Sequence, residues 1–294
     1  QIVAMESTDL RSLTSTQVLA LKTDQLVKLS ADQISAMNSG QVSALTTAQL
    51  TALTTDKVAA LTSSQVASLT SAQVSTLSTA QIAAITIEAV GGLKVSSLQT
   101  SQLVKLSTDQ VAALTMAQAA SLTTGQIASL TTDQIVAMES TDLRSLTSTQ
   151  VRALKTDQLV KLSADQISAM SSGQLAALTT AQLIALTTDK VAALTSSQVA
   201  SLTSAQVSAL TTDQIASIEL EDFGALKVSS LQTSQLVKLS ADQVAALTTA
   251  QAASLTTGQM ASLTTDQIVA MEIEDLRSLT PTQVRALKTD QLVK

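Results

Sequence analysis

The sequence predicts an all-α protein: a tightly wound α-solenoid of very short helices, about six residues each, with one helix per octapeptide repeat. Three observations lead to this prediction. A large aliphatic residue returns every eight residues along almost the whole chain. Each octapeptide carries the residue types that start a helix. Glycine and proline, which the turns of a β-solenoid require, number only seven and one in 294 residues.

The repeat can be followed from its aliphatic residue, which we number position 1 of the octapeptide, or octad. Position 1 runs from Met5 to Leu287 through 37 residues, of which 30 are Leu, five Met and two Ile. Eight residues at about 100° each rotate a helix through about 800°, so a continuous helix would gather no apolar stripe. Positions 1, 6 and 9 are apolar, which is not the alternation of a strand. The octad therefore fits separate short helices best.

Positions 2 and 5 supply the helix start. Ser, Thr or Asn occupies position 2 in 26 of the 35 full octads, and Gln occupies position 5 in 28. In a capping box the position 2 side chain accepts the backbone N–H three residues on, and the Gln reaches back to the N-cap. Positions 1 and 6 then form a hydrophobic staple. We expect Leu and Val or Ile to face inward, with the small residues at positions 7 and 8 allowing close approach.

Individual octads along the chain strengthen this prediction. Asp133 stands at position 4, which is N2 of its helix, where a carboxylate meets the positive end of the helix dipole. Asp157 and Lys161 form an i,i+4 pair with the cation toward the C-terminal end. The one proline, Pro281, follows Thr280 and so falls at N1, where a helix tolerates it.

A longer repeat contains the octads. The string "QIVAME" begins at Gln1, Gln134 and Gln267, so the super-repeat is 133 residues long. We predict a single continuous repeat array over residues 1–294, a window of a longer repetitive protein. No alternation over 16 or 24 residues stands out that would indicate the number of helices per turn.

Each super-repeat has one irregular place. Two of the 36 spacings are five residues instead of eight, both in the string "LKVSSL", and the breaks lie near 85–98 and 218–231. Just before them, in "ITIEAVGG" and "IELEDFGA", the third position becomes apolar at Ile87 and Leu220, as it does again at Ile273. One interpretation is local: the winding changes phase, apolar residues fill the kink, and the glycines let the chain bend. The other is an outward apolar patch that a neighbouring chain contacts. On that interpretation the candidate self-association residues are Ile87, Val90, Leu220 and Phe223, with the adjoining "LKVSSL" segments.

The composition argues against several function classes. The chain has no Cys and no His, and its Ser and Thr are needed as caps, so we expect no enzyme and no small-molecule substrate. We also expect no metal and no other cofactor. The net charge of −6 with 14% charged residues leaves no basic stripe for nucleic acid. Apolar runs of about four or five residues are too short to span a membrane.

The "LTxxQVxAL" repetition and the low-charge composition, rich in Ser, Thr, Gln and Ala, extend over the whole chain. In these two respects the chain resembles long repeat arrays of bacterial cell-surface and secreted proteins. The resemblance implies an extracellular or cell-surface setting, in bacteria, and a filament, stalk or adhesin-like role.

Three functional hypotheses follow. The first is a structural repeat protein, an extended solenoid rod that assembles with itself into a filament or serves as a stalk. Near-identical copies such as "LQTSQLVKLSTDQVAAL" from Leu98 and "LQTSQLVKLSADQVAAL" from Leu231 suit a regular lattice, although recent duplication also produces them. The second is a binding array, in which Thr residues at position 3 form a ladder for ice or glycans. The third, an enzyme, is the least favoured because no nucleophile–base pair is present.

Overall fold

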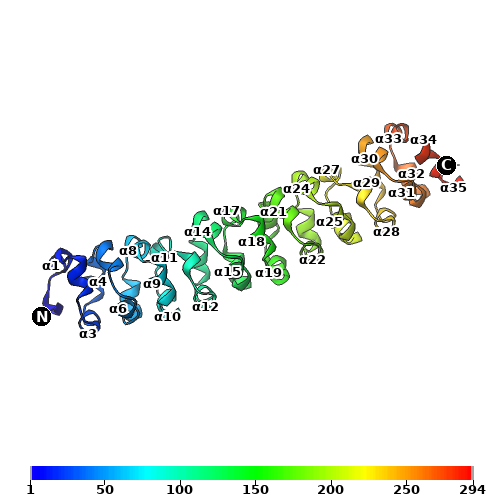
Figure 1. Ribbon diagram of the computed structural model, residues 1–294. Helices are drawn as coiled ribbons and strands as arrows, with labels where there is room; N and C mark the ends of the chain where they lie inside the picture. Colours follow the sequence, from blue (N-terminus) through cyan, green and yellow to red (C-terminus); the bar gives the residue numbers. More distant parts are fainter. Residues whose placement is uncertain (1, 293–294) are drawn as a thin grey trace. The chain divides into compact units, whose positions relative to one another are not determined.

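The computed structural model describes residues 2–292, and every regular element in that range is helical. The α-helices are four to six residues long, one per full octad, which confirms the predicted fold class. The chain divides into two compact units, Gln1–Leu146 and Thr147–Lys294 (Figure 1). Each unit is described by itself, and the single continuous array over 1–294 stays a prediction.

The first unit contains, in chain order, η1 (Ile2–Ala4), α1 (Ser7–Ser12), α2 (Ser15–Leu19), α3 (Thr23–Leu26), α4 (Ala31–Ala36), α5 (Ser39–Ser43), α6 (Thr47–Thr51), α7 (Thr55–Ala59), α8 (Ser63–Ser68), α9 (Ser71–Thr76), α10 (Thr79–Ala83), α11 (Ile87–Val90), η2 (Val95–Ser97), α12 (Thr100–Leu103), α13 (Thr108–Ala112), α14 (Met116–Ser121), α15 (Thr124–Ser129), α16 (Thr132–Ala137) and α17 (Ser140–Ser145).

The second unit contains α18 (Ser148–Arg152), α19 (Thr156–Lys161), α20 (Ala164–Ser168), α21 (Ser172–Ala177), α22 (Thr180–Ile184), α23 (Thr188–Ala192), α24 (Ser196–Ser201), α25 (Ser204–Ala209), α26 (Thr212–Ala216), α27 (Leu220–Phe223), η3 (Val228–Ser230), α28 (Thr233–Leu236), α29 (Ala241–Ala245), α30 (Thr249–Ser254), α31 (Thr257–Ser262), α32 (Thr265–Ala270), α33 (Ile273–Ser278), α34 (Pro281–Ala286) and α35 (Thr289–Leu292).

The helices start where the octads predict. At α6, Gln49 N–H donates to Thr46 Oγ1 over 3.1 Å, and Thr46 N–H donates to Gln49 Oε1 over 2.7 Å. This is the reciprocal capping box. Pro281 occupies N1 of α34, as expected.

The tightest corners between helices need only two residues. Leu69, at the end of α8, has φ −58° and ψ 137°, and Thr70, the N-cap of α9, has φ −73° and ψ 160°. Both are extended conformations that any L-residue adopts. No residue in the described range has a positive φ, so the backbone conformation of the corners does not require glycine.

The winding brings every third helix together. In the first unit α5 packs on α8, and α6 packs on α9. In the second unit α21 packs on α24 in the same way. Each unit is therefore a solenoid with about three helices per turn, and one turn uses about three octads (Figure 1).

The core of each unit is made by positions 1 and 6 of the octads. Val42 has no exposed surface, and Leu45 is 4% exposed. The same holds along most of both units, for Leu, Met and Ile at position 1 and for Val, Ile and Leu at position 6, whereas Leu276, Val284 and Leu292 in the last three octads are exposed. The inward-facing hydrophobic staple is thus also the contact between coils.

Candidate functional site

The glutamine at position 5 makes a second set of hydrogen bonds, to the preceding coil, that the capping pattern did not predict. Gln41 is fully buried, and its Nε2 donates to the carbonyls of Leu13 over 2.7 Å and of Leu10 over 2.9 Å. Both carbonyls lie at the C-terminal end of α1 in the preceding coil, Leu10 in its last turn and Leu13 at its C-cap. Gln41 Oε1 meanwhile accepts the Asn38 N–H over 2.8 Å. One amide therefore closes the capping box and ties two coils together.

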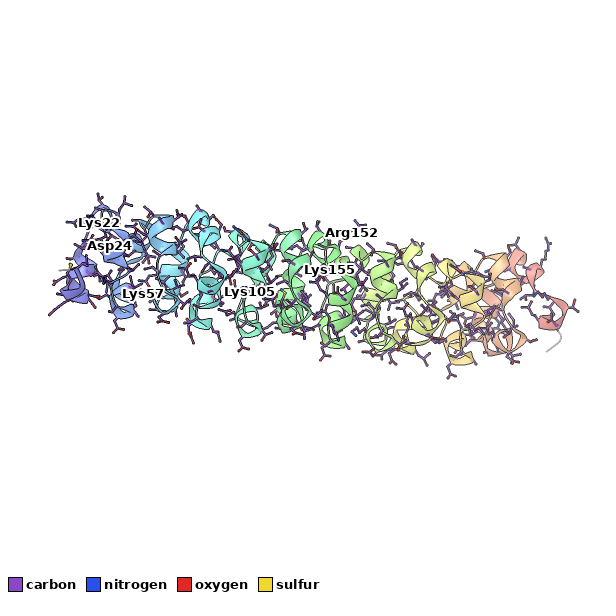
Figure 2. The ribbon with its side chains drawn as sticks, turned by 90° about the horizontal axis from the view of Figure 1, so that it is seen from below. Lys22, Asp24, Lys57, Lys105, Arg152 and Lys155 are labelled. Carbon is purple, nitrogen blue, oxygen red and sulfur yellow. The ribbon has the colours of Figure 1, made fainter. Side chains whose placement is uncertain are left out.

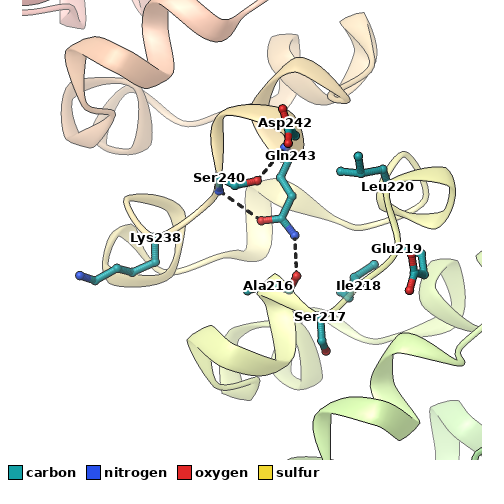
Figure 3. Close-up of a pocket in the computed structure, with 9 residues that line it drawn as sticks. All are labelled: Ala216, Ser217, Ile218, Glu219, Leu220, Lys238, Ser240, Asp242 and Gln243. Atoms are coloured by element: carbon teal, nitrogen blue, oxygen red, sulfur yellow. Dashed lines mark hydrogen bonds between the residues drawn. The ribbon is translucent and has the colours of Figure 1, made fainter.

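The same bond recurs through both units, and we call the series the glutamine ladder. Figure 3 shows one rung in the second unit, where Gln243 closes the box with Ser240 and donates across to Ala216. The usual rung joins residues 28 apart, as from Gln206 Nε2 to the Leu178 carbonyl. A buried amide left without partners would cost about 1–3 kcal/mol, so the ladder holds the coils in one register.

A signal for the ladder was present in the sequence. Glu completes a capping box as well as Gln does, yet Glu stands at position 5 in none of the 35 full octads. Only the amide offers an acceptor to its own N-cap and a donor to a neighbouring carbonyl. The octads without Gln at position 5 carry Asp9, Lys57, Ala89, Asp142, Lys190, Asp222 and Asp275.

The five-residue spacings do not interrupt the winding. In the first unit η2 takes the place of a full helix, because it packs on α9 before it and on α14 after it. The helices on either side keep their third-neighbour contacts, as α10 does with α12. The rungs that cross this short turn join residues 25 apart instead of 28, as from Gln110 to Ile85.

The short segment has no position 5, and a lysine supplies the missing rung. Lys94 Nζ donates to the carbonyls of Leu69 and Ala67 in the coil before it. At the second break Lys227 Nζ donates to the Leu202 carbonyl. Leu69 and Leu202 both stand at position 1, the acceptor that Gln Nε2 uses elsewhere.

Of the four predicted self-association residues, two are exposed and two are buried. Ile87 and Leu220 are 48% and 49% exposed, as expected of position 3. Val90 and Phe223 have no exposed surface, so their place in an outward patch is wrong. Both stand at position 6, where all octads but the last three of the second unit turn the side chain into the core of their unit. Of the four, Ile87 and Leu220 are therefore the ones that a neighbouring chain could reach.

The glycines of the first break also act differently from the bend that we expected. Gly92 has no positive φ, but a Cβ there would lie 2.3 Å from the Ser63 carbonyl oxygen and 2.9 Å from the Ala67 nitrogen. Gly92 thus allows a close approach to α8. A Cβ on Gly91 would meet nothing within 4 Å.

Leu220 borders an open groove of about 420 Å³ beside the second break. Glu219, Ser240 and Asp242 also line it, and the Lys238 side chain points away from it (Figure 3). Similar grooves occur at the corner around Thr179 and at the corner around Asn38. The groove is thus a recurring corner of the octad, and Leu220 is what distinguishes this copy.

Charged side chains are spread thinly. In the first unit Lys22, Lys57 and Lys105 lie on separate coils (Figure 2). Among residues 2–292 there is no group of three or more Asp or Glu placed to share a metal ion. In the same range no helix has the length and apolar character needed to cross a bilayer.

Comparison with known protein families gives one match. The model described as "ALTTAQ repeat" matches residues 2–39, 34–71, 135–172, 168–204, 215–257, 228–265 and 268–293. These segments overlap in places and together cover more than half of the chain. No curated protein matches it.

Proposed function

The chain belongs to the ALTTAQ repeat family, and we propose that it is a structural spacer whose stacked coils hold other parts of an assembly apart. The glutamine ladder carries this proposal. Within each unit, successive coils are joined by buried hydrogen bonds such as Gln206 to Leu178, 2.8 Å. The number of octads then sets the number of coils, as in other solenoid proteins.

The use of the hydroxyl groups supports a role without catalysis. Thr46 Oγ1 accepts the Gln49 N–H over 3.1 Å, and most Ser and Thr caps of both units repeat this bond; Thr54, Thr86 and Thr187 do not. A catalytic hydroxyl needs a general base within hydrogen-bond reach. The caps face backbone N–H groups instead, so we propose that the chain is not an enzyme.

The finer part of the proposal is that copies of the chain meet through Ile87 and Leu220. Each occurs once per super-repeat and is half exposed at a position that is usually polar or Ala. Contacts that recur at fixed intervals join copies into a regular filament when the rotation between them does not close a ring. We propose an extracellular or bacterial cell-surface setting for this assembly, on the resemblance in composition.

Octad insertion tests the spacer. Duplication of residues 178–201, three octads of the second unit, adds one turn. We expect the maximum dimension of the particle in small-angle X-ray scattering to grow by about 10 Å per duplication, the distance between packed helices. Deletion of the same residues is the matched control and should shorten it equally. A dimension that does not follow the number of octads contradicts the proposal.

A row of threonines supports the second candidate function, the binding array for ice or glycans. Thr55, Thr79, Thr100 and Thr124 are N1 residues of α7, α10, α12 and α15, which are successive third neighbours. They form one row of threonines on four consecutive coils, and all but Thr79 are exposed. Thermal hysteresis of the full chain, and its loss when the row is replaced by Ser, would support ice binding. A chain without hysteresis and without binding on a glycan array removes this candidate.

A further inference from the structure

Two buried carboxyl groups occupy rungs of the glutamine ladder. Asp142 on α17 and Asp275 on α33 stand at position 5, and each is only 2% exposed. One carboxyl oxygen of each, Oδ2, is buried and has no hydrogen-bond partner. Nearly every other buried side chain at this position is a Gln that bonds across the coils.

The register of the flanking rungs indicates which carbonyl corresponds to each carboxyl group. On either side of Asp275, Gln267 Nε2 donates to the Leu239 carbonyl over 3.0 Å, and Gln283 Nε2 donates to the Leu255 carbonyl over 2.8 Å. The equivalent acceptor for Asp275 is the Leu247 carbonyl, 28 residues before it. The same register directs Asp142 to the Leu114 carbonyl.

An ionised carboxylate is unsuited to this place because it only accepts hydrogen bonds, and so does a carbonyl. A neutral carboxylic acid carries one O–H and can donate it. Asp222, also at position 5, does have a hydrogen-bond donor in the preceding coil, because the Ser196 hydroxyl donates to its Oδ1. The Oδ2 atoms of Asp142 and Asp275 have no such donor, although the Asp142 carboxyl accepts the Glu139 backbone N–H.

We propose that Asp142 and Asp275 are proton-operated contacts between coils. When protonated, each donates its O–H to the position 1 carbonyl of the preceding coil and completes the ladder. When the proton leaves, the carboxylate faces that carbonyl with no donor, and the contact between α33 and α30, or between α17 and α14, loosens.

The charges around the two groups favour the protonated form. Burial raises the pKa of Asp142, and the neighbouring Glu139 charge adds to this, while the Glu139 backbone N–H opposes it. Burial also raises the pKa of Asp275, with Glu272 and Glu274 adding to it. The packed helices α14 and α30 carry no ionisable side chain. The cations on α17 and α33 are Arg144 and Arg277.

The direction of the pH dependence follows. Because the folded pKa of each group is raised, the folded chain binds more protons than the unfolded chain between the two pKa values. The contribution to stability is full below the unfolded value, about 3.9, and is lost as pH rises through the folded value.

A second copy of the Asp142 octad lies in a different environment. Residues 5–13 and 138–146 are the same string, "MESTDLRSL", so Asp9 and Asp142 have identical neighbours in sequence. Asp9 lies on α1 in the first coil and is exposed. The difference in burial between Asp9 and Asp142 therefore comes from the preceding coil and not from the octad itself.

A titration of the full chain followed by carboxyl ¹³C NMR tests the proposal. We expect Asp142 and Asp275 to titrate above the value of an unfolded aspartate, about 3.9. Titration of both groups at or below that value overturns the proposal. The titration is repeated with calcium chloride. If calcium lowers the pH at which Asp142 and Asp275 titrate, the two groups hold a cation and the proton contact is wrong.

Variants give a second, independent measurement. Asp142→Gln with Asp275→Gln restores the common rung, so the urea midpoint should rise at pH 7. The gain should shrink as pH falls, because protonated Asp then makes the same bond. Asp266→Asn, at the exposed position 4 of α32, is the matched control and should show no such pattern. A gain of equal size at every pH overturns the proposal.

Discussion

Gln41 and Leu13 are 28 residues apart in the chain and are joined by a 2.7 Å hydrogen bond from the Gln41 Nε2 to the Leu13 carbonyl. The bond spans one turn of the solenoid, and Gln41 Oε1 at the same time closes the cap of its own helix. Local helix formation and stacking of coils therefore depend on the same side chain, which makes position 5 the most informative place for substitution.

Gln206→Glu should destabilise the second unit by about 1–3 kcal/mol. Glu keeps the acceptor for the Thr203 N–H but places an acceptor against the Leu178 carbonyl, where Gln206 now donates. Urea unfolding followed by circular dichroism measures the loss. Ala205→Glu, at the exposed neighbouring position, adds the same charge and should cost little. Equal losses would mean that the charge, and not the rung, is responsible.

Position 5 should also matter more than position 3. Gln→Gly at position 5 in several octads removes half of each capping box and a rung of the ladder, and so should lower stability more than Gly at position 3 of the same octads. Thermal unfolding of the two variant sets compares them. Similar melting temperatures would contradict the register that the structure has.

Lys227→Met should weaken the second break by about 1 kcal/mol, because it removes the hydrogen bond to the Leu202 carbonyl while keeping an aliphatic side chain. Hydrogen exchange of the amides in η3 reports the local effect as faster exchange. Lys238→Met, whose side chain points away from the neighbouring groove, is the control for loss of charge (Figure 3). Unchanged exchange in η3 after Lys227→Met would mean that the lysine is not a rung.

Two adjacent glycines should respond in opposite directions. Gly92→Ala places a Cβ 2.3 Å from the Ser63 carbonyl oxygen, and such overpacking destabilises by about 1–3 kcal/mol. Gly91→Ala meets nothing within 4 Å at a helical φ of −59° and should stabilise by about 0.4–1 kcal/mol. The urea midpoints of the two variants decide. A loss of stability in both would indicate that the break needs flexible backbone instead of a close approach.

Substitution of the exposed self-association residues should affect assembly, whereas substitution of a buried one should affect stability. Ile87→Ser with Leu220→Ser should lower assembly, measured by sedimentation velocity and electron microscopy, and leave helix content unchanged. Ile184→Ser is the control, because Ile184 is similarly exposed, at 44%, but lies outside the breaks. Phe223→Ser should instead reduce stability by about 3–5 kcal/mol, as expected for a large core side chain. A monomeric parent chain under all conditions would exclude the filament.

The pattern of the octads was sufficient for much of this result. Capping boxes and hydrophobic staples join residues three to five apart, so they act before any tertiary contact forms. The helix starts at Thr46 and at Thr280, the latter followed by Pro281 at N1, were therefore readable from neighbouring residues. The burial of Val90 and Phe223 was readable too, since both occupy position 6, and our prediction failed because it gave more weight to the irregular octad than to its register.

By itself, the sequence determined where each helix begins, how long it is and which side chains face inward, because these are set by local capping and apolar spacing. Only the tertiary structure decided that a turn takes about three helices, that η2 fills a helix place, and that Lys94 stands in for a glutamine. Those features depend on which carbonyl a side chain meets 25 or 28 residues away. Octads this uniform present the same carbonyl at every corner, so the partner is chosen by the winding of the coils.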